Sequence, residues 1–259
     1  MSVIRLAIAG AAGRMGRALA SAAEGQPDLA VAAGTEHGAG LQASLPFPVF
    51  ASPAQAMAGA DVWIDFTTPA ATAATAQALT GAGVKAAIIG TTGLSQAEEA
   101  IIAQAAQSLP IVKAGNFSLG VAVLSALVRQ AARALGPAYD IEIEEAHHRH
   151  KVDAPSGTAL MLGEAAAAGR GAPLEALRIA PRDGITGPRP EGGIGFAVIR
   201  GGGIVGRHSV AFAGQREIVT LQHEALDRSV FADGALAAAR WAISQPPGLY
   251  SIADVVGLA

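Results

Sequence analysis

The first 114 residues alternate between apolar runs that suit buried strands and runs with the apolar spacing of helices. The strand-like runs are 3–9, 29–33, 47–50, 62–66, 84–89 and 111–114, and the helix-like runs are 14–24, 53–58, 69–80 and 95–108. Strands that alternate with helices predict a parallel sheet covered on both faces. Near-continuous apolar strands fit that arrangement better than a half-exposed antiparallel sheet.

The pattern changes after about residue 118. A helix is predicted at 118–135, and the run 139–146 alternates apolar and acidic residues, which indicates a strand with one solvated or functional face. The later segments are strands at 194–200, 204–212 and 216–223, an irregular Pro- and Gly-rich connection at 171–193, and an amphipathic helix at 229–244. The later strands indicate a mixed or antiparallel sheet, and the last helix can return to the first domain. We therefore predict an α/β chain of two domains, residues 1–118 with 229–259 and residues 119–228.

Composition and charge narrow the possible functions. The 259 residues carry a net charge of −3, which provides no basic field for nucleic acid, and they include no Cys. Disulfides, thiolate catalysis and Cys-ligated metal centres are thereby excluded. The N-terminus lacks the pattern of a signal peptide, and the longest apolar stretch, near 121–128, is interrupted by Ser125 and is too short to span a bilayer. We expect a soluble cytoplasmic protein with no membrane partner.

A glycine-rich loop joins the first predicted strand to the first helix. Its sequence is Gly10-Ala11-Ala12-Gly13-Arg14-Met15-Gly16. Glycines let the backbone approach a pyrophosphate, whose charge the helix N-terminus then stabilises. The plain alternative is a tight strand–helix turn, since the spacing is GxxGxxG rather than GxGxxG. The strand–helix–strand context favours dinucleotide binding.

The end of the second strand bears on the choice of cofactor. Glu36 is the one acid there that could contact a ribose 2′-hydroxyl. No Arg or Lys lies between 18 and 84, so a 2′-phosphate would have only Arg14 or Arg17 to bind. This pattern favours NADH over NADPH.

Two more loops at strand ends carry small hydroxyl residues. They are Asp65-Phe66-Thr67-Thr68-Pro69 and Gly90-Thr91-Thr92-Gly93. Ligands of open α/β sheets bind at the carboxyl ends of the strands. Each loop could be a plain capping turn, but their recurrence favours contact with a cofactor.

Residues 145–158 hold the densest group of basic side chains. The chain has three lysines; Lys151 follows His147, His148 and His150 directly, whereas Lys85 and Lys113 lie at or in predicted strands and are assigned no chemistry. One interpretation is a zinc site, although neighbouring Lys and Arg oppose a cation and no Cys assists, so we expect no metal. A second is a solvated basic loop.

The third interpretation of this segment is a catalytic site that binds an anion. Pro155-Ser156-Gly157-Thr158 opens a helix, so backbone N–H groups and hydroxyls can hold a carboxylate. His148 and Lys151 add positive charge. His147 and Lys151 can hand over protons near neutral pH, Lys151 only where basic neighbours favour its neutral form.

The chain resembles the 4-hydroxy-tetrahydrodipicolinate reductase family. The resemblance is carried by Glu-Ala-His-His-Arg-His-Lys-Val-Asp-Ala-Pro-Ser-Gly-Thr-Ala at 145–159 and, in order, by 10–16, Ile64-Asp65-Phe66-Thr67, 90–93 and Ala114-Gly115-Asn116-Phe117-Ser118. It implies a Rossmann-like parallel-sheet cofactor domain and a smaller α+β mixed-sheet domain for substrate binding and oligomerisation. It also implies a homotetramer that reduces a cyclic dicarboxylate with a hydride from NADH or NADPH and loses water, in lysine and diaminopimelate biosynthesis.

The resemblance also implies roles for residues of this chain. His147 is the implied proton donor or acceptor and Lys151 the proton donor, while His148, Ser156, Gly157 and Thr158 are implied to bind substrate. The cofactor contacts that the resemblance implies are Gly10, Ala11, Ala12, Gly13, Arg14, Met15, Gly90, Thr91, Thr92, Ala114, Gly115, Asn116 and Phe117. The loops described above add Glu36, Phe66 and Thr67 as expected contacts. Thr35-Glu36 departs from the family's acid, which is often followed by Arg, and Thr68 replaces a frequent Arg.

Two other functions compete with this one. Another NAD(P)-dependent imine or amino-acid oxidoreductase could share the glycine loop, because fold alone does not fix the reaction. Such an enzyme would need another reason for the Lys-x-Asp-Ala-Pro-Ser-Gly-Thr segment. An NAD-sensing regulatory module is expected to show a DNA-binding helix pair or a basic face, and the sequence shows neither.

Overall fold

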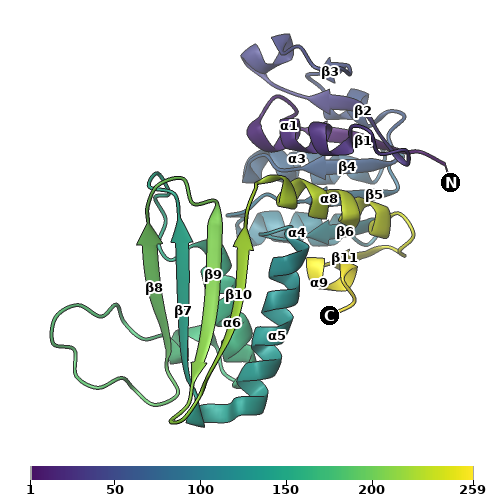
Figure 1. The fold of residues 1–259 in the computed structure, drawn as a ribbon. Helices are drawn as coiled ribbons and strands as arrows, with labels where there is room; N and C mark the ends of the chain where they lie inside the picture. The colour runs from purple at the N-terminus through teal and green to yellow at the C-terminus, as the bar shows by residue number, and fades with distance from the viewer. Residues whose placement is uncertain (1, 259) are drawn as a thin grey trace. The chain divides into compact units, whose positions relative to one another are not determined.

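The computed structural model describes residues 2–258, which form two compact units. One unit contains the described residues up to Leu119 together with those from Ser229 onward, and the other is Gly120–Arg228. The first is built on a seven-stranded parallel sheet of order β11-β6-β5-β4-β1-β2-β3 (Figure 1).

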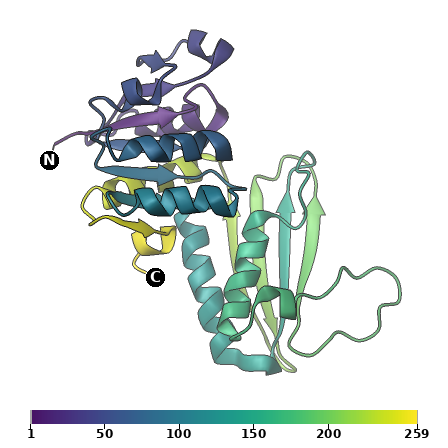
Figure 2. The same cartoon turned by 180° about the vertical axis from the view of Figure 1, so that it is seen from behind.

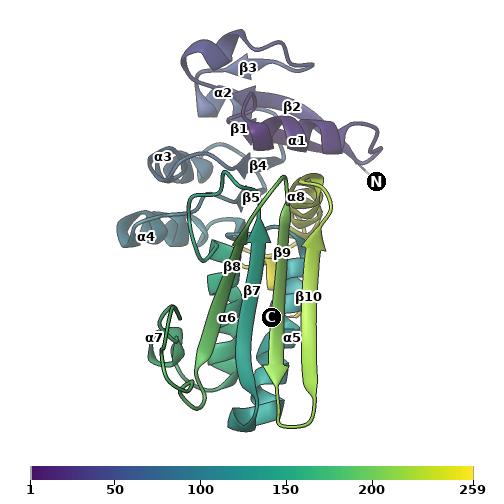
Figure 3. The ribbon, with the colours of Figure 1, turned by 60° about the vertical axis from the view of Figure 1, so that its left-hand side comes forward.

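The elements of the first unit alternate along the chain as its sequence pattern predicts. They are β1 (Ile4–Ala9), α1 (Arg14–Ala23), β2 (Leu29–Thr35), the 3₁₀ helix η1 (Gly38–Gln42), β3 (Val49–Phe50), α2 (Pro53–Met57), β4 (Val62–Asp65), α3 (Pro69–Leu79), β5 (Ala86–Ile89), α4 (Gln96–Ala105), β6 (Pro110–Lys113), α8 (Ser229–Ala242), β11 (Gly248–Tyr250) and α9 (Ile252–Val255). The central strands β1, β4 and β5 are almost entirely buried. A parallel sheet needs cover on both faces, and α3 and α4 lie on one side of it while α1 and α8 lie on the other (Figure 3).

Successive residues of each strand point to opposite faces of the sheet, so the core of this unit has one part on each face. On the α3–α4 side, Trp63, Ile89 and Ile111 from the strands pack with Leu79 and Ile102 from the helices. Trp63 is one of the largest fully buried side chains. This packing fixes the strands relative to one another, so the loops at their carboxyl ends are attached to a rigid sheet.

A carboxylate at the amino ends of the strands joins β1 to β5. Asp61 accepts hydrogen bonds from the Arg5 amide at 2.9 Å and Arg5 Nε at 3.1 Å, and it forms an ion pair with Lys85 at 3.1 Å. Burial raises the pKa of Asp61, but the bonds from Arg5 and Lys85 outweigh burial and lower it to about 2. Lys85 is therefore a structural cation at the end of the sheet opposite to the glycine loop.

The second unit is a four-stranded mixed sheet of order β10-β9-β7-β8, in which only the β7–β8 pair is parallel. Its elements are α5 (Leu119–Leu135, with its first residue in the other unit), the 3₁₀ helix η2 (Gly136–Ala138), β7 (Asp140–His147), α6 (Gly157–Gly169), α7 (Leu174–Leu177), β8 (Ile194–Arg200), β9 (Gly206–Ala213) and β10 (Ile218–Ala225). Helices α5 and α6 lie against one face of the sheet (Figure 2). The short helix α7 lies within the segment predicted to be irregular.

Helix α5 supplies part of this core. Leu124, Val128 and Ala132 recur at helical spacing and pack with Ile143 and Phe212 of the sheet. By length and composition alone, the helical stretch Leu119–Ala138 could also cross a membrane. In this fold 28% of its 18-residue apolar window is buried, and Val123 and Leu127 on the same helix are exposed.

Candidate active site

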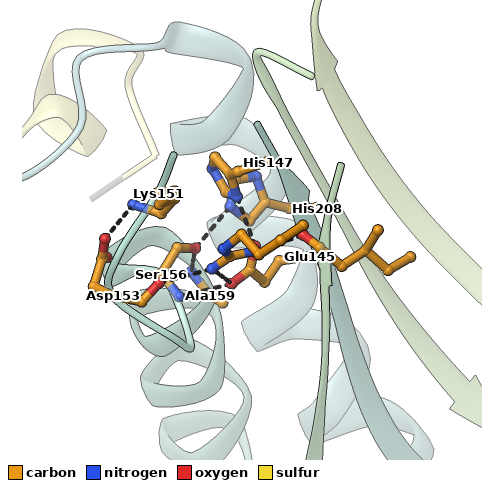
Figure 4. A network of polar contacts seen from close by, with 9 residues as sticks. Glu145, His147, Lys151, Asp153, Ser156, Ala159 and His208 are labelled. Atoms are coloured by element: carbon orange, nitrogen blue, oxygen red, sulfur yellow. Dashed lines mark hydrogen bonds and ion pairs between the residues drawn. The ribbon is translucent and has the colours of Figure 1, made fainter. Parts of the chain in front are cut away.

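Strand β7 carries two polar residues in a row of otherwise apolar positions. Ile141, Ile143, Glu145 and His147 follow one another at every second residue, so they share the helix-covered face of the sheet. Glu145 is buried with the two isoleucines, and His147 ends the strand. Figure 4 shows the polar network that forms around this pair.

The Glu145 carboxylate accepts hydrogen bonds on both oxygens. Arg200 donates to each oxygen at 2.7 Å, the Ser156 amide donates at 3.0 Å, and His147 Nδ1 lies 2.6 Å away. Burial raises the pKa of Glu145, but these hydrogen bonds outweigh burial and hold the pKa below its ordinary value. Glu145 is therefore an anion at neutral pH.

His147 lies between this anion and a second histidine. Its ring meets that of His208 edge to face, with centroids 5.1 Å apart. Burial lowers the pKa of His147, Glu145 raises it, and the charges of Lys151 and Arg200 lower it again. The net pKa is below the ordinary value, so His147 is mainly neutral at neutral pH.

His208 is a member of the network that sequence reasoning missed. It lies on β9 directly across from Glu145 and is 4% exposed, and its Nε2 is 3.1 Å from Ser156 Oγ. Burial, together with a smaller effect of the neighbouring His147, lowers its pKa to about 4. The pairing of β7 with β9 would have placed His208 beside Glu145, but the sequence pattern does not reveal which strands pair.

Ser156 caps helix α6, as the sequence predicts. Its Oγ accepts a hydrogen bond from the Ala159 amide at 3.2 Å, and Gly157 and Thr158 form the first positions of the helix. The first turn of α6 itself holds no acidic residue, while the Glu145 carboxylate occupies the amide of the Ser156 cap.

Lys151 and His148 border the same network. Lys151 Nζ lies 2.9 Å from an Asp153 carboxylate oxygen, and Arg200 binds the Asp153 carbonyl at 2.8 Å. Burial and the nearby charges of Arg228 and His150 lower the pKa of His148. The lowered pKa favours the uncharged form of His148, and its role in binding an anion stays a prediction.

The zinc interpretation finds no matching geometry. Among residues 2–258, no group of three or more His, Asp or Glu side chains is arranged to hold a metal ion. In the network itself, His147 and His208 are joined to Glu145 and Ser156 by hydrogen bonds.

In the first unit, the predicted cofactor loops follow neighbouring strands. The glycine loop comes after β1, and the segments 66–68, 90–93 and 114–117 come after β4, β5 and β6. Glu36 comes after β2. These five strands are consecutive in a parallel sheet, so their carboxyl ends share one edge. The structure thus brings together the loops that the sequence singled out.

The glycine loop has the shape of a phosphate cradle. Gly10 has a φ of +64°, and a Cβ at Gly16 would lie 2.4 Å from the Gly10 carbonyl oxygen. Helix α1 begins at Arg14 without a side-chain cap, and Glu36 accepts a hydrogen bond from the Ala12 amide at 2.6 Å. The loop and the helix start thus approach each other without side chains between them, and Glu36 reaches the loop from the neighbouring strand.

A buried carboxylate organises the next two loops. Asp65, which is 1% exposed, accepts hydrogen bonds from the Thr67 amide at 2.9 Å, Thr67 Oγ1 at 2.6 Å and Thr75 Oγ1 at 3.1 Å. Thr91 from the following loop donates to it at 3.5 Å and accepts from the Thr67 amide at 3.1 Å. Sequence reasoning placed Asp65 in a predicted cofactor loop, but did not identify it as the buried acceptor that joins the loops containing Thr67 and Thr91.

The predicted cofactor residues differ in exposure. Arg14, Thr92 and Gly115 are exposed, and Met15, Phe66, Ala114 and Asn116 are partly buried. Ala11 and Phe117 are core side chains at 0% and 1%, so only their backbones can face a ligand. A Cβ at Gly90 would lie 1.9 Å from the Phe66 ring, which fixes the approach of these two loops.

Comparison with known proteins assigns the chain to one family. The model described as dihydrodipicolinate reductase, N-terminus, matches residues 4–117, and the model described as dihydrodipicolinate reductase, C-terminus, matches residues 120–256. The chain belongs to the dihydrodipicolinate reductase family. The resemblance seen in residues 145–159 is thereby confirmed.

Individual relatives of this reductase family span the whole chain. A 4-hydroxy-tetrahydrodipicolinate reductase from Caulobacter vibrioides is 53% identical over 260 residues, which cover 98% of this chain and 97% of that protein. A protein of the same name from Parvibaculum lavamentivorans is 52% identical over 267 residues, which cover 98% of each. The dipicolinate-bound dihydrodipicolinate reductase from Paenisporosarcina sp. TG-14 matches with a TM-score of 0.78 at 27% identity and covers 96% of this chain and 97% of its own. The predicted Rossmann-like sheet with a separate mixed-sheet domain is confirmed.

Proposed function

We propose that this chain reduces 4-hydroxy-tetrahydrodipicolinate to tetrahydrodipicolinate in lysine and diaminopimelate biosynthesis. The relatives that match over full length carry this activity in their names. The observation that carries the proposal is the network of His147, Glu145, Ser156 and Lys151 at the start of α6, because it joins anion binding to proton transfer.

The first unit is proposed to hold the dinucleotide. Gly10 to Met15 would face its pyrophosphate, and the loops that contain Thr67, Thr91 and Asn116 would complete the edge of the sheet. NADH or NADPH, when bound, supplies the hydride. Glu36 beside the glycine loop and the absence of Lys and Arg from 18–84 support NADH over NADPH, which kcat/KM measured with each cofactor tests. A clear preference for NADPH would overturn this part of the proposal.

The second unit is proposed to bind the substrate, a cyclic dicarboxylate. Its carboxylates would be held by Lys151, the Ser156 hydroxyl and the backbone at Gly157 and Thr158, with His148 as a neutral donor. Binding there fixes the ring for reaction, and such orientation is a large part of catalysis. The dipicolinate that the Paenisporosarcina protein binds is a carboxylate ligand of this kind.

The chain's own residues are proposed to manage the proton. Overall, the substrate gains one hydride and one proton and loses one water. Lys151 is the proposed proton donor, and His147 Nε2 is the proposed second site of proton exchange, because Nδ1 is held by Glu145. A positioned acid or base of this kind contributes about 10²–10⁴-fold to the rate.

The test of this proposal is oxidation of NADH by the purified chain when 4-hydroxy-tetrahydrodipicolinate is supplied. Lys151→Ala is expected to lower kcat by about 10²-fold or more while the KM for cofactor changes little. Lys85→Ala is the matched control, because Lys85 belongs to the first unit and pairs there with Asp61 at the amino ends of the strands. Near-full turnover in Lys151→Ala would refute the proton-donor role. Wild-type activity on another imine substrate alone would favour the rival oxidoreductase.

A homotetramer in the cytoplasm is part of the same proposal. The face of the mixed sheet that α5 and α6 leave open exposes Ile199 and Ile218, which are 40% and 66% accessible. Apolar residues of this kind on a sheet face suit contact between subunits. Light scattering of the purified protein measures the oligomer, and a monomer at all concentrations would contradict the tetramer.

A further inference from the structure

A charged residue in the buried row of β7 needs an explanation. Glu145 follows Ile141 and Ile143 on the covered face, where an apolar side chain would continue the core. An ionised carboxylate costs several kcal/mol to bury unless it is paired and hydrogen-bonded. A Glu retained there therefore points to a use for its charge beyond packing.

The geometry of the bonds shows what the carboxylate fixes. An ionised carboxylate only accepts hydrogen bonds, so the 2.6 Å contact requires the proton of His147 to be on Nδ1. Nε2 is then the nitrogen that exchanges protons with a substrate. The two Arg200 bonds at 2.7 Å prevent the carboxylate from turning away, because they occupy both of its oxygens.

Strand register places Arg200 for this purpose. Arg200 on β8 pairs in register with His147 on β7, so its side chain reaches Glu145 from the neighbouring strand. The same guanidinium binds the carbonyl of Asp153, whose carboxylate contacts Lys151. Arg200 thus connects the surroundings of both proposed proton-transfer residues.

Apart from Glu145, the described neighbours of the His147 ring form no hydrogen bond with it. His208 on β9 is neutral and contacts the ring edge to face, while its Nε2 is directed to Ser156. Gly206, also on β9, lies so close that a Cβ there would be 3.2 Å from His147 Nε2. The charged groups that influence the ring are Glu145 on β7, Arg200 on β8 and Lys151 in the following loop.

We propose that Glu145, held in place by Arg200, is a positioning residue that fixes the tautomer and orientation of His147 for proton transfer. The catalytic half of this statement depends on the proposed reductase function, whereas the effect on the His147 ring does not. Glu145 acts through His147 and is not proposed to touch substrate.

The test compares Glu145→Gln with Glu144→Gln. Glu144 is the next residue on the same strand, but it faces the opposite side of the sheet, where it pairs with Arg207 at 3.2 Å. The readouts are nitrogen NMR shifts of the His147 ring as a function of pH and the pH profile of kcat. Both are measured for the intact chain.

The expected results follow from the loss of charge. Glu145 raises the pKa of His147, so Glu145→Gln is expected to lower that pKa and to move the His147 limb of the kcat profile to lower pH. An amide can accept from or donate to Nδ1, so the ring is expected to become a mixture of tautomers. We expect kcat to fall by about 10- to 100-fold, less than the full effect of an acid–base group. Glu144→Gln should change none of these quantities.

The possible outcomes separate the two proposals. An unchanged tautomer and pKa of His147 in Glu145→Gln overturns the positioning role, whatever the enzyme's activity. Wild-type protein that fails to reduce 4-hydroxy-tetrahydrodipicolinate overturns the proposed function, while the NMR result still decides the Glu145 contact. If the unpaired Arg200 prevents Glu145→Gln from folding, the double variant Glu145→Gln/Arg200→Met removes both charges and is measured in the same way.

Discussion

Replacement of Ser156 by Ala tests whether the helix cap and the buried histidine form one unit. The Ser156 hydroxyl accepts from the Ala159 amide at 3.2 Å and lies 3.1 Å from His208 Nε2. In the part of the chain that the structure describes, His208 Nδ1 is buried without a hydrogen-bond partner. Loss of the hydroxyl therefore leaves both ring nitrogens of His208 unpaired.

The expected cost has two parts. Loss of an N-cap hydroxyl destabilises a protein by about 1 kcal/mol. Loss of the partner of a buried polar group adds about 1–3 kcal/mol. We therefore expect Ser156→Ala to lower the free energy of unfolding by about 2–4 kcal/mol. Ser95→Ala is the matched control, since Ser95 also caps a helix but is exposed and contacts no histidine, and its expected cost is about 1 kcal/mol.

Native-state hydrogen exchange measures these costs separately for the two units. Slowly exchanging amides of β7 report on Ser156→Ala, and those of β4 report on Ser95→Ala. The KM for substrate is measured in parallel, and it is expected to rise in Ser156→Ala only, because the start of α6 is the proposed carboxylate site. Equal costs for the two variants would refute the reasoning, since the His208 contact would then contribute nothing.

Three further predictions follow from close contacts and charges. Gly13→Val is expected to abolish cofactor binding in a fluorescence titration, because a Cβ there already lies 3.0 Å from the Gly10 carbonyl oxygen and the valine methyl groups would occupy the phosphate cradle. Gly206→Ala is expected to lower kcat several-fold by displacing the His147 ring, whereas Gly203→Ala, whose Cβ would meet nothing within 4 Å, should not. Asp61→Asn is expected to lower stability at pH 7 by about 2 kcal/mol, since the pKa falls from 3.8 to about 2 on folding. In denaturant titrations, the difference in stability between the wild type and Asp61→Asn should be complete above pH 4. It should disappear as the pH falls toward 2.

Much of the first unit could be predicted from its sequence because its strands are buried on both faces and therefore almost continuously apolar. The predicted strand at 47–50 is shorter in the structure, where β3 pairs with β2 through only Val49 and Phe50. Pro46 and Pro48 lack the amide hydrogen needed to extend an edge strand. Helix α7 was missed because one turn is too short to establish a helical period.

The candidate site was predictable only where its residues are close in sequence. His147, Lys151 and Ser156 lie within one motif, and the local order of polar residues is enough to single them out. Arg200 and His208 reach the network from 55 and 52 positions away from the residues they bond. Their places depend on β8 running parallel and β9 antiparallel to β7, and a pattern of apolar residues does not specify which strands pair.

The three lysines show why position in the sequence alone did not establish a role. Each forms an ion pair: Lys85 with Asp61, Lys113 with Glu99, and Lys151 with Asp153. The partners differ in burial, since the Asp61 side chain is 8% exposed and that of Asp153 is 54% exposed. An ion pair with an exposed carboxylate contributes about 0–1 kcal/mol, so an incoming substrate carboxylate can replace Asp153 at little cost. Lys85 helps to hold a buried carboxylate whose pKa is strongly lowered, and Lys151 is thus the lysine of these two that is available for chemistry.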